Sequence, residues 1–232
     1  MKRTWCIGIM NAVFIACMEK LLWLYSLAYD ASYPVVCFDE RPCFLIGEVI
    51  EPISLQTGKV AKQHYAYEKK GSCCLLSAIE PLSGKRLGQV HKQRTKKEYT
   101  LFMQALAASY PDAKKIRLVQ DNLNTHNASS FYEHLPADEA FALAERFEYH
   151  YTPKAASWLN MIEIEFSALA SQCLHRRIAS QEVLEKQVLA LIKERNDKHI
   201  KITWQFSLQA AREKLNSKYE KVNPDNIKFH KT

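Results

Sequence analysis

Two short apolar runs in the sequence each end in an acid, and this repeated pattern restricts the fold more than any other feature. The first run, VVCFDE at residues 35–40, follows a Tyr-Pro break and contains Asp39, and the second, KIRLVQDN, contains Asp121. Short, continuous apolar runs are typical of strands buried on both faces of a sheet. Ligands of open α/β sheets bind at the carboxyl ends of such strands. We therefore expect Asp39 and Asp121 to lie at a shared site.

The rest of the chain alternates strand and helix patterns, which predicts one α/β domain. Three runs at residues 62–69, 72–81 and 86–92 predict an antiparallel meander, and a further short strand is expected at 147–151. Helices are expected over residues 11–28, 95–109, 128–135, 138–146, 157–174, 181–195 and 207–219. The domain organisation that we expect is a helix and linker at 1–34, a core at 35–175 and a helical carboxyl-terminal extension at 176–232.

Charge is distributed unevenly along the chain. The formal net charge is +7, but residues 85–117 carry +7, residues 118–174 carry −6 and residues 175–232 carry +6. Basic segments on both sides of an acidic one suit a site that binds a polyanion and holds a metal ion among carboxylates. Solvated helix faces give the same charge pattern.

The seven cysteines and the amino terminus both bear on the compartment. The cysteines include no CxxC pair, which argues against a disulfide framework or a structural zinc and favours a reducing cytoplasm. The opening MKRTWCIGIMNAVFIAC resembles a signal peptide, but Thr4 and Asn11 interrupt its apolar run and helical spacing continues beyond it. Glu19 and Lys20 interrupt the apolar stretch before it reaches the ~20 residues of a membrane span. We therefore expect neither export nor membrane insertion.

A third acid is needed to complete a metal site with Asp39 and Asp121, and the segment YTPKAASWLNMIEIEF offers two, Glu163 and Glu165. Three converging carboxylates repel one another unless a divalent cation lies between them, and oxygen ligands favour Mg²⁺ or Mn²⁺ over zinc. The two glutamates lie about 200° apart around a helix, so both cannot serve one site. If Asn160 points at the site, only Glu163 can, which leaves Glu165 at the surface. Trp158 is expected in the core, in one apolar stripe with Ile162 and Phe166.

The blocks VCFDE, LVQDNLNTH and HYTPKAASWLNMIEIEFSALASQCLHRR, in this order, resemble the catalytic core of a DDE transposase of the IS630 branch of the IS630/Tc1/mariner superfamily. The resemblance implies an RNase H-like fold, with a mixed five-stranded sheet flanked by helices. It also implies the catalytic and metal-binding set Asp39, Asp121 and Glu163 with two Mg²⁺ or Mn²⁺ ions. The implied activity is cleavage and transfer of DNA strands, with transposon ends and target DNA as partners and a homodimer as the active form. Such a bacterial protein would be cytoplasmic and bound to the nucleoid during activity.

Other residues are weaker candidates. Glu40 should point away from Asp39, towards solvent or a structural salt bridge. Asn122, His126 and Asn160 are supporting candidates, His126 either as a phosphate or water contact or as a turn stabiliser. The candidate DNA-binding residues are Lys92, Arg94, Lys96, Lys97, Lys154, Arg176 and Arg177.

The chain departs from the family pattern in two ways. A His-Gly pair usually follows TPK in the family, whereas Ala155 and Ala156 stand here. The helix-turn-helix region that usually precedes the catalytic core is not recognisable, so we expect either a separately encoded DNA-reading subunit or a truncated remnant. A catalytically inactive remnant that only binds DNA or dimerises is the alternative function, and a cellular nuclease of the same fold, such as a resolvase, is a third.

Overall fold

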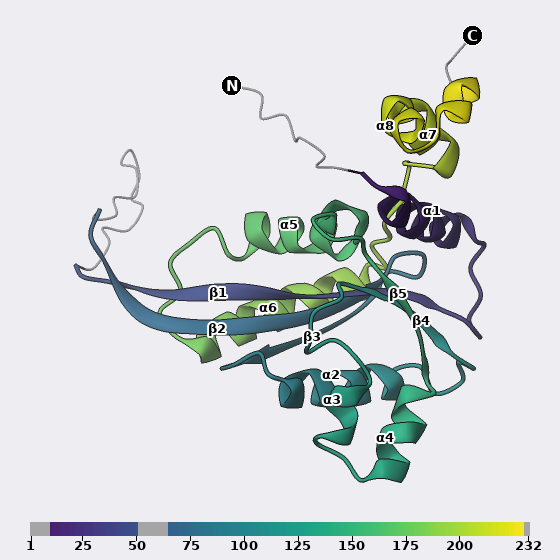
Figure 1. Ribbon diagram of the computed structural model, residues 1–232. Coiled ribbons are helices and arrows are strands. Elements are labelled where there is room, and N and C mark those ends of the chain that lie inside the picture. Colours follow the sequence, from purple (N-terminus) through teal and green to yellow (C-terminus); the bar gives the residue numbers. More distant parts are fainter. Residues whose placement is uncertain (1–9, 51–64, 230–232) are drawn as a thin grey trace.

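The computed structural model describes residues 10–50 and 65–229, with a central five-stranded sheet between layers of helices (Figure 1). The strands are β1 (Val35–Glu48), β2 (Tyr67–Glu80), β3 (Lys85–His91), β4 (Ile116–Gln120) and β5 (Phe147–Tyr151). The helices are α1 (Ala12–Ser26), α2 (Lys96–Ala108), α3 (Ser129–Tyr132), α4 (Ala137–Ala144), α5 (Ile162–Gln172), α6 (Gln181–Asp197), α7 (Leu208–Lys214) and α8 (Asn216–Val222), with short 3₁₀ turns at Ser157–Leu159 and Pro224–Phe229.

The sheet is mixed, with the strand order β3-β2-β1-β4-β5. β1 pairs antiparallel with β2 and parallel with β4, β2 pairs antiparallel with β3, and β4 pairs parallel with β5. This sheet with helices on both faces is the RNase H-like α/β fold that the sequence resemblance implies. The parallel pairing places the carboxyl end of β4 beside the first residues of β1, where Cys37 is aligned with Val119.

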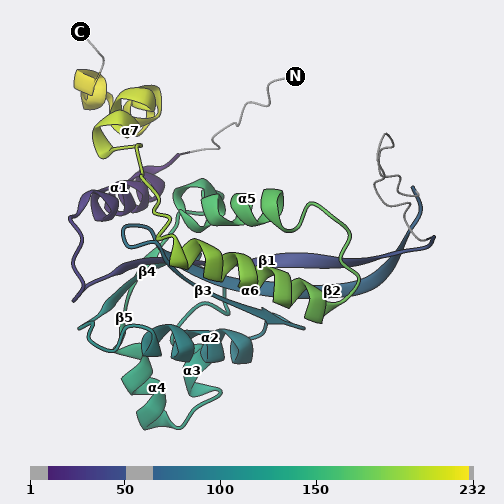
Figure 2. The same ribbon diagram turned by 180° about the vertical axis from the view of Figure 1, so that it is seen from behind.

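Alternation along the central strands produces two separate cores, one on each face of the sheet. Cys37, Leu75 and Ile79 face α1, α5 and α6, whereas Val36, Phe38 and Leu76 face α2, α3 and α4. Figure 2 shows α6 lying along the sheet beside α5, on the face opposite α2. Asp39 therefore projects from the same face as Cys37, towards α5, and Glu40 projects from the face that α2 covers.

Several predicted elements differ in extent from the observed ones. The meander runs at 62–69 and 72–81 were predicted as two strands, but the described part, from Tyr67, belongs to the single strand β2. Gly71, with φ of 122°, lies where the β1–β2 register shifts, so the strand passes through a bulge instead of ending. The helix predicted at 157–174 is interrupted at Asn160, and that at 207–219 is divided into α7 and α8.

Most of the described cysteines are buried in the core. Cys37, Cys43, Cys73, Cys74 and Cys173 are buried free thiols. Within the described ranges, no helix has the length and apolarity to cross a bilayer. Residues 1–9 lie outside those ranges, so the expectation about export remains untested.

Candidate active site

Asp39, Asp121 and Glu163 come from three different elements and approach one another at the carboxyl end of the parallel strands. Asp39 is in β1, Asp121 directly follows β4, and Glu163 is in the first turn of α5. Burial, together with the negative charges of Asp121 and Glu163, raises the pKa of Asp39 to about 7 against the opposing effects of the Glu40 amide and His126. The structure thus brings together the three acids selected from the sequence.

Asn160 fixes the start of α5 against the strand that carries Asp39. The residue is 2% exposed, and its Nδ2 donates a hydrogen bond of 2.8 Å to the carbonyl oxygen of Phe38. Its Oδ1 accepts a longer bond, 3.4 Å, from the amide of Ile162, the first residue of the helix. Because Phe38 precedes Asp39 and Ile162 precedes Glu163, one amide side chain sets the separation of the two acids. Asn160 therefore positions the site and does not point into it as a ligand.

His126 joins Asp121 to a fourth acid, Glu40. Its Nδ1 is hydrogen-bonded to Asp121, and its Nε2 lies 3.0 Å from Glu40 Oε1. Burial acts to lower the pKa of His126, but the two carboxylates outweigh it and raise the pKa to about 9. The imidazole is therefore protonated at neutral pH and donates to both acids. The prediction that Glu40 forms a structural salt bridge is confirmed, because its side chain is 3% exposed and bound to His126.

Aromatic packing holds the His126 ring in place. The ring stacks on Tyr99 at 5.1 Å and meets Phe38 edge-on at 5.3 Å. Gln120, the last residue of β4, accepts a hydrogen bond from the Tyr99 hydroxyl and donates one of 2.6 Å to the His126 carbonyl oxygen. The turn from Asp121 to His126 is thus anchored to the core at its far end. Sequence reasoning did not find Tyr99 or Gln120, since both look like ordinary core positions.

The oxygen donors of this site suit a hard divalent cation, although the side chains do not form a finished cage. Within the described residues, no three His, Cys, Asp or Glu side chains are grouped so that they could hold a metal ion. The pKa of Asp39 is raised first by burial and also by the charges of Asp121 and Glu163, and a cation would relieve that repulsion. Three carboxylates without nitrogen or sulfur donors fit Mg²⁺ or Mn²⁺ better than zinc. To bind an ion together, the three carboxylates would have to move closer to one another.

Glu165 was expected at the surface, and this expectation is wrong. Its side chain is fully buried and accepts two hydrogen bonds from Arg195, at 2.8 Å and 3.1 Å. Arg86 Nε lies 2.9 Å from Glu165 Oε2, without the alignment of a hydrogen bond. The helix geometry that separated Glu163 from Glu165 holds, but the second acid faces β3 and α6 instead of solvent. The two arginines, from β3 and α6, compensate the charge that burial would otherwise penalise.

Trp158 was expected in the core and is instead 37% exposed. It lies in the 3₁₀ turn before Asn160, outside α5, so it does not continue the apolar stripe of Ile162 and Phe166. Its ring packs edge-on against Phe206 at 5.8 Å.

The predicted DNA-binding residues fall into two groups. Lys92, Arg94, Lys97, Lys154 and Arg176 are exposed. Lys96 pairs with Glu133, and Arg177 pairs with Glu48 at 2.5 Å and lies over the Tyr67 ring. Of these exposed residues, Arg94 forms an ion pair with a residue beside the site, since its Nη1 lies 3.8 Å from Glu40 Oε2. Asn122 is exposed directly after Asp121.

The comparisons with known proteins agree with this geometry. The family model described as DDE superfamily endonuclease matches residues 34–185. Among solved structures, the Mos1 mariner paired end complex with Mn is similar, with a TM-score of 0.55 at 15% identity over 98% of this chain and 68% of that chain. The Mos1 mariner paired end complex with Mg gives the same TM-score and identity, over 97% of this chain and 66% of that one.

The chain thus spans about two thirds of the length of these transposases, and at 15% identity the likeness establishes the fold alone. No curated protein sequence matches the chain. The family model covers more than half of the sequence and includes Asp39, Asp121 and Glu163. On this evidence, the chain belongs to the DDE superfamily endonucleases.

Proposed function

We propose that this protein is the catalytic domain of a transposase of the IS630 branch, which cleaves DNA at transposon ends and joins those ends to target DNA. The observation that carries the proposal is the approach of Asp39, Asp121 and Glu163 from β1, the end of β4 and the start of α5. Acids on separate elements at the carboxyl edge of a sheet have little structural purpose there, because their mutual repulsion destabilises the fold.

Two Mg²⁺ or Mn²⁺ ions held by these three acids would stabilise the attacking and leaving oxygens of phosphoryl transfer. In the cleavage step, a water oxygen forms a bond to phosphorus, the bond from phosphorus to the 3′ oxygen breaks, and that oxygen gains a proton to become a 3′-hydroxyl. In the joining step, the 3′-hydroxyl oxygen attacks a phosphodiester of the target, and a target 3′ oxygen leaves.

The surrounding residues keep the acids in position for this chemistry. Asn160 holds Glu163 at a fixed distance from Asp39, and protonated His126 orients Asp121 through Nδ1. Arg94, which is exposed and lies 3.8 Å from Glu40, and the exposed Lys97 would contact phosphates of the DNA. The Mos1 structures are paired end complexes, which supports transposon-end DNA and a second copy of the chain as partners.

Recognition of the transposon ends is a separate part of the proposal. We expect a helix-turn-helix subunit, encoded separately, to supply it, and the assembly to act on the nucleoid in the cytoplasm. Pull-down with candidate subunits expressed from the adjoining reading frame tests this point, and failure of every such subunit to bind the chain would contradict it.

A catalytically inactive remnant is the second candidate function, and one observation favours it. Ala155, where the family pattern has His-Gly, has φ of 60°, a left-handed conformation that disfavours alanine. This strained turn precedes the segment that carries Asn160 and Glu163.

Nicking of supercoiled plasmid DNA in Mg²⁺ or Mn²⁺, with and without the helix-turn-helix subunit, separates the two candidates. The proposal expects metal-dependent nicking that Asp39→Asn, Asp121→Asn and Glu163→Gln each abolish. Glu139→Gln, a change at an exposed residue of α4, serves as the matched control. Nicking that survives any of the three site changes would refute that assignment, and DNA binding without any nicking would establish the remnant.

A further inference from the structure

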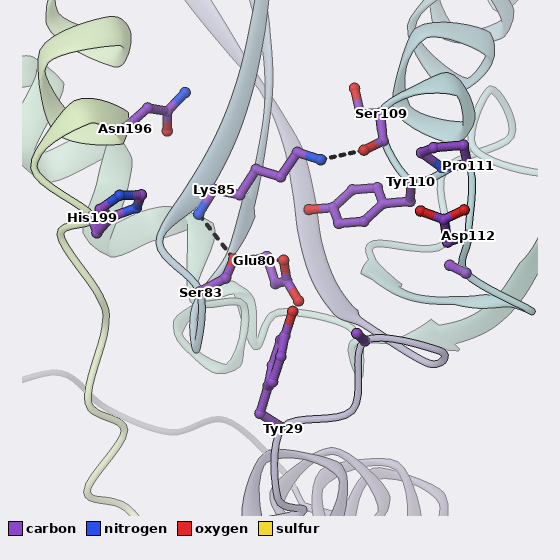
Figure 3. Close-up of a pocket in the computed structure, with 12 residues that line it drawn as sticks. Tyr29, Glu80, Ser83, Lys85, Ser109, Tyr110, Pro111, Asp112, Asn196 and His199 are labelled. Atoms are coloured by element: carbon purple, nitrogen blue, oxygen red, sulfur yellow. Dashed lines mark hydrogen bonds between the residues drawn. The ribbon is translucent and has the colours of Figure 1, made fainter.

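A cavity lies at the opposite end of the parallel strands from the acidic site. It has a volume of about 550 Å³ and is lined by the segment before β1, the β2–β3 turn, the loop between α2 and β4, and the end of α6 (Figure 3). Asp112 and Ala113 on its wall precede β4, whereas Asp121 follows it. The five-residue strand between them spans roughly 17 Å, so the two sites are separate.

Glu80 is the unusual residue of this cavity. It is 3% exposed, its Oε2 accepts a hydrogen bond of 2.5 Å from the Ser83 hydroxyl, and its Oε1 is buried without a hydrogen-bond partner. A buried carboxylate oxygen without a donor is costly, which makes Glu80 a place where a ligand would gain affinity.

The neighbours of Glu80 do not neutralise it. Lys85 donates to the Ser109 carbonyl oxygen and lies 4.0 Å from the centre of the Tyr110 ring, and it forms no ion pair with Glu80. Figure 3 shows Tyr29, Tyr110 and Lys85 around the carboxylate. Burial, then the charge of Glu80 and the approach of the Tyr110 hydroxyl to that carboxylate, raise the pKa of Tyr110, and the Glu80 charge also raises the pKa of Tyr29. The negative charge of Glu80 therefore acts on the hydroxyl groups of both Tyr110 and Tyr29.

Two walls of the cavity are tied together by backbone contacts, which favours a preformed site. The amide of Arg86 donates to Asn196 Oδ1, and Asn196 Nδ2 donates back to the Arg86 carbonyl oxygen, which joins β3 to α6. Gly84, with φ of 79°, lets the β2–β3 turn pass so close to Ile200 that a Cβ would lie 2.9 Å from its carbonyl oxygen. A preformed site loses less entropy on binding than a flexible one.

We propose that this cavity binds the guanidinium group of an arginine carried by a peptide segment. A guanidinium in the cavity can pair with the negative charge of the Glu80 carboxylate while its plane lies against an aromatic ring, and Tyr29 offers a ring that is 56% exposed. The exposed carboxylate of Asp112 on the cavity wall adds negative charge. The volume falls within the range of about 300–1,000 Å³ of ligand pockets and leaves room for peptide backbone. This inference is independent of the proposed function.

The direct test is calorimetric titration with the peptide acetyl-Gly-Arg-Gly-amide, using a citrulline peptide of the same shape and no charge as the control ligand. We expect saturable binding of the arginine peptide to the wild type and at least tenfold weaker binding of the citrulline peptide. Glu80→Gln should weaken arginine-peptide binding at least tenfold, whereas Glu139→Gln should leave it unchanged. Absence of saturation up to about 5 mM peptide, or equal affinity for wild type and Glu80→Gln, would overturn the proposal.

Tyr29→Leu provides a variant that does not depend on the buried carboxylate. Since Tyr29 is exposed, the change leaves the core untouched and is expected to weaken binding by about two- to fivefold. If Glu80→Gln fails to fold by circular dichroism, an unchanged affinity of Tyr29→Leu refutes the site. Sedimentation velocity distinguishes the sources of the arginine: self-association that Glu80→Gln weakens identifies a second copy of this chain, and unchanged self-association identifies another protein.

Discussion

Replacing Glu165 with glutamine removes the charge that two arginines share inside the protein. Glu165 and Arg86 are both fully buried in their side chains, and Arg195 is 11% exposed. Burial lowers the pKa of Arg86, and the charge of Glu165 opposes that effect. Glutamine has almost the same shape, so the change leaves the packing intact and leaves two guanidinium groups without a counter-charge.

The expected cost follows from this burial. Breaking a buried ion pair by removing one partner costs about 3–5 kcal/mol, because the remaining charge is uncompensated. A chain of this size loses roughly 2–4 °C in Tm per kcal/mol, so Glu165→Gln should lower Tm by about 6–20 °C. Glu163→Gln should have the opposite or no effect, since the charge of Glu163 opposes the ionisation of Asp39.

Differential scanning calorimetry of metal-free protein measures both variants under one condition. Adding Arg195→Met to Glu165→Gln tests the pairing, because the double variant should lose less than the sum of the two single losses. A Tm for Glu165→Gln within about 2 °C of the wild type would refute the buried ion-pair network. A larger loss for Glu163→Gln than for Glu165→Gln would refute the division of roles between the two acids.

Three further predictions follow from the site and the turn before it. Asn160→Ala leaves the buried Phe38 carbonyl oxygen without its donor and should cost about 1–3 kcal/mol in urea unfolding; an unchanged midpoint would contradict the anchoring role. Ala155→Gly relieves the left-handed φ of 60° and should raise the unfolding free energy by about 0.5–1 kcal/mol in the same assay, and a decrease would refute the strain. Since Asp39 has a raised pKa in the folded state, its contribution to stability is complete below about pH 4 and is lost as pH rises through about 7. The free energy of unfolding of the metal-free wild type should therefore fall over this pH range relative to that of Asp39→Asn. If the unfolding free energies of the two proteins vary in parallel with pH, the raised pKa of Asp39 is contradicted.

Local sequence signals predicted those helices whose ends are determined by residues adjacent in the sequence. α2 begins where Thr95 and Glu98 form a capping box and ends shortly before Pro111, as expected from the sequence alone. The long strands were less predictable. Gly71 and Pro42 interrupt the β pattern locally, but pairing of β1 with β2 continues through both residues, with Pro42 opposite Cys74. Strand length here depends on the partner strand, which a local pattern does not contain.

The candidate site was predictable in its acids and unpredictable in their supports. Asp39 and Asp121 follow from two apolar runs that each end in an acid, although β1 continues past Asp39 to Glu48, and the spacing from Asn160 selects Glu163 over Glu165. The burial of Glu165 depends on Arg86 and Arg195, which belong to different elements far away in the sequence. Its charge alone favoured a surface position, because glutamate is almost never fully buried unless it is paired.

The charges around the acids explain why Glu40, which projects from the other face of the sheet, belongs to the same site. His126 is protonated between Asp121 and Glu40, and Arg94 lies 3.8 Å from Glu40. With all four carboxylates ionised, these two cations would leave two negative charges, the number that one divalent ion neutralises. Without Glu40, the positive charge of His126 would fall on Asp121 alone and weaken that carboxylate as a ligand. Under the proposed function, Glu40 would thus divide the charge of His126 between two acids, so that Asp121 would hold a cation while the ring keeps it in place.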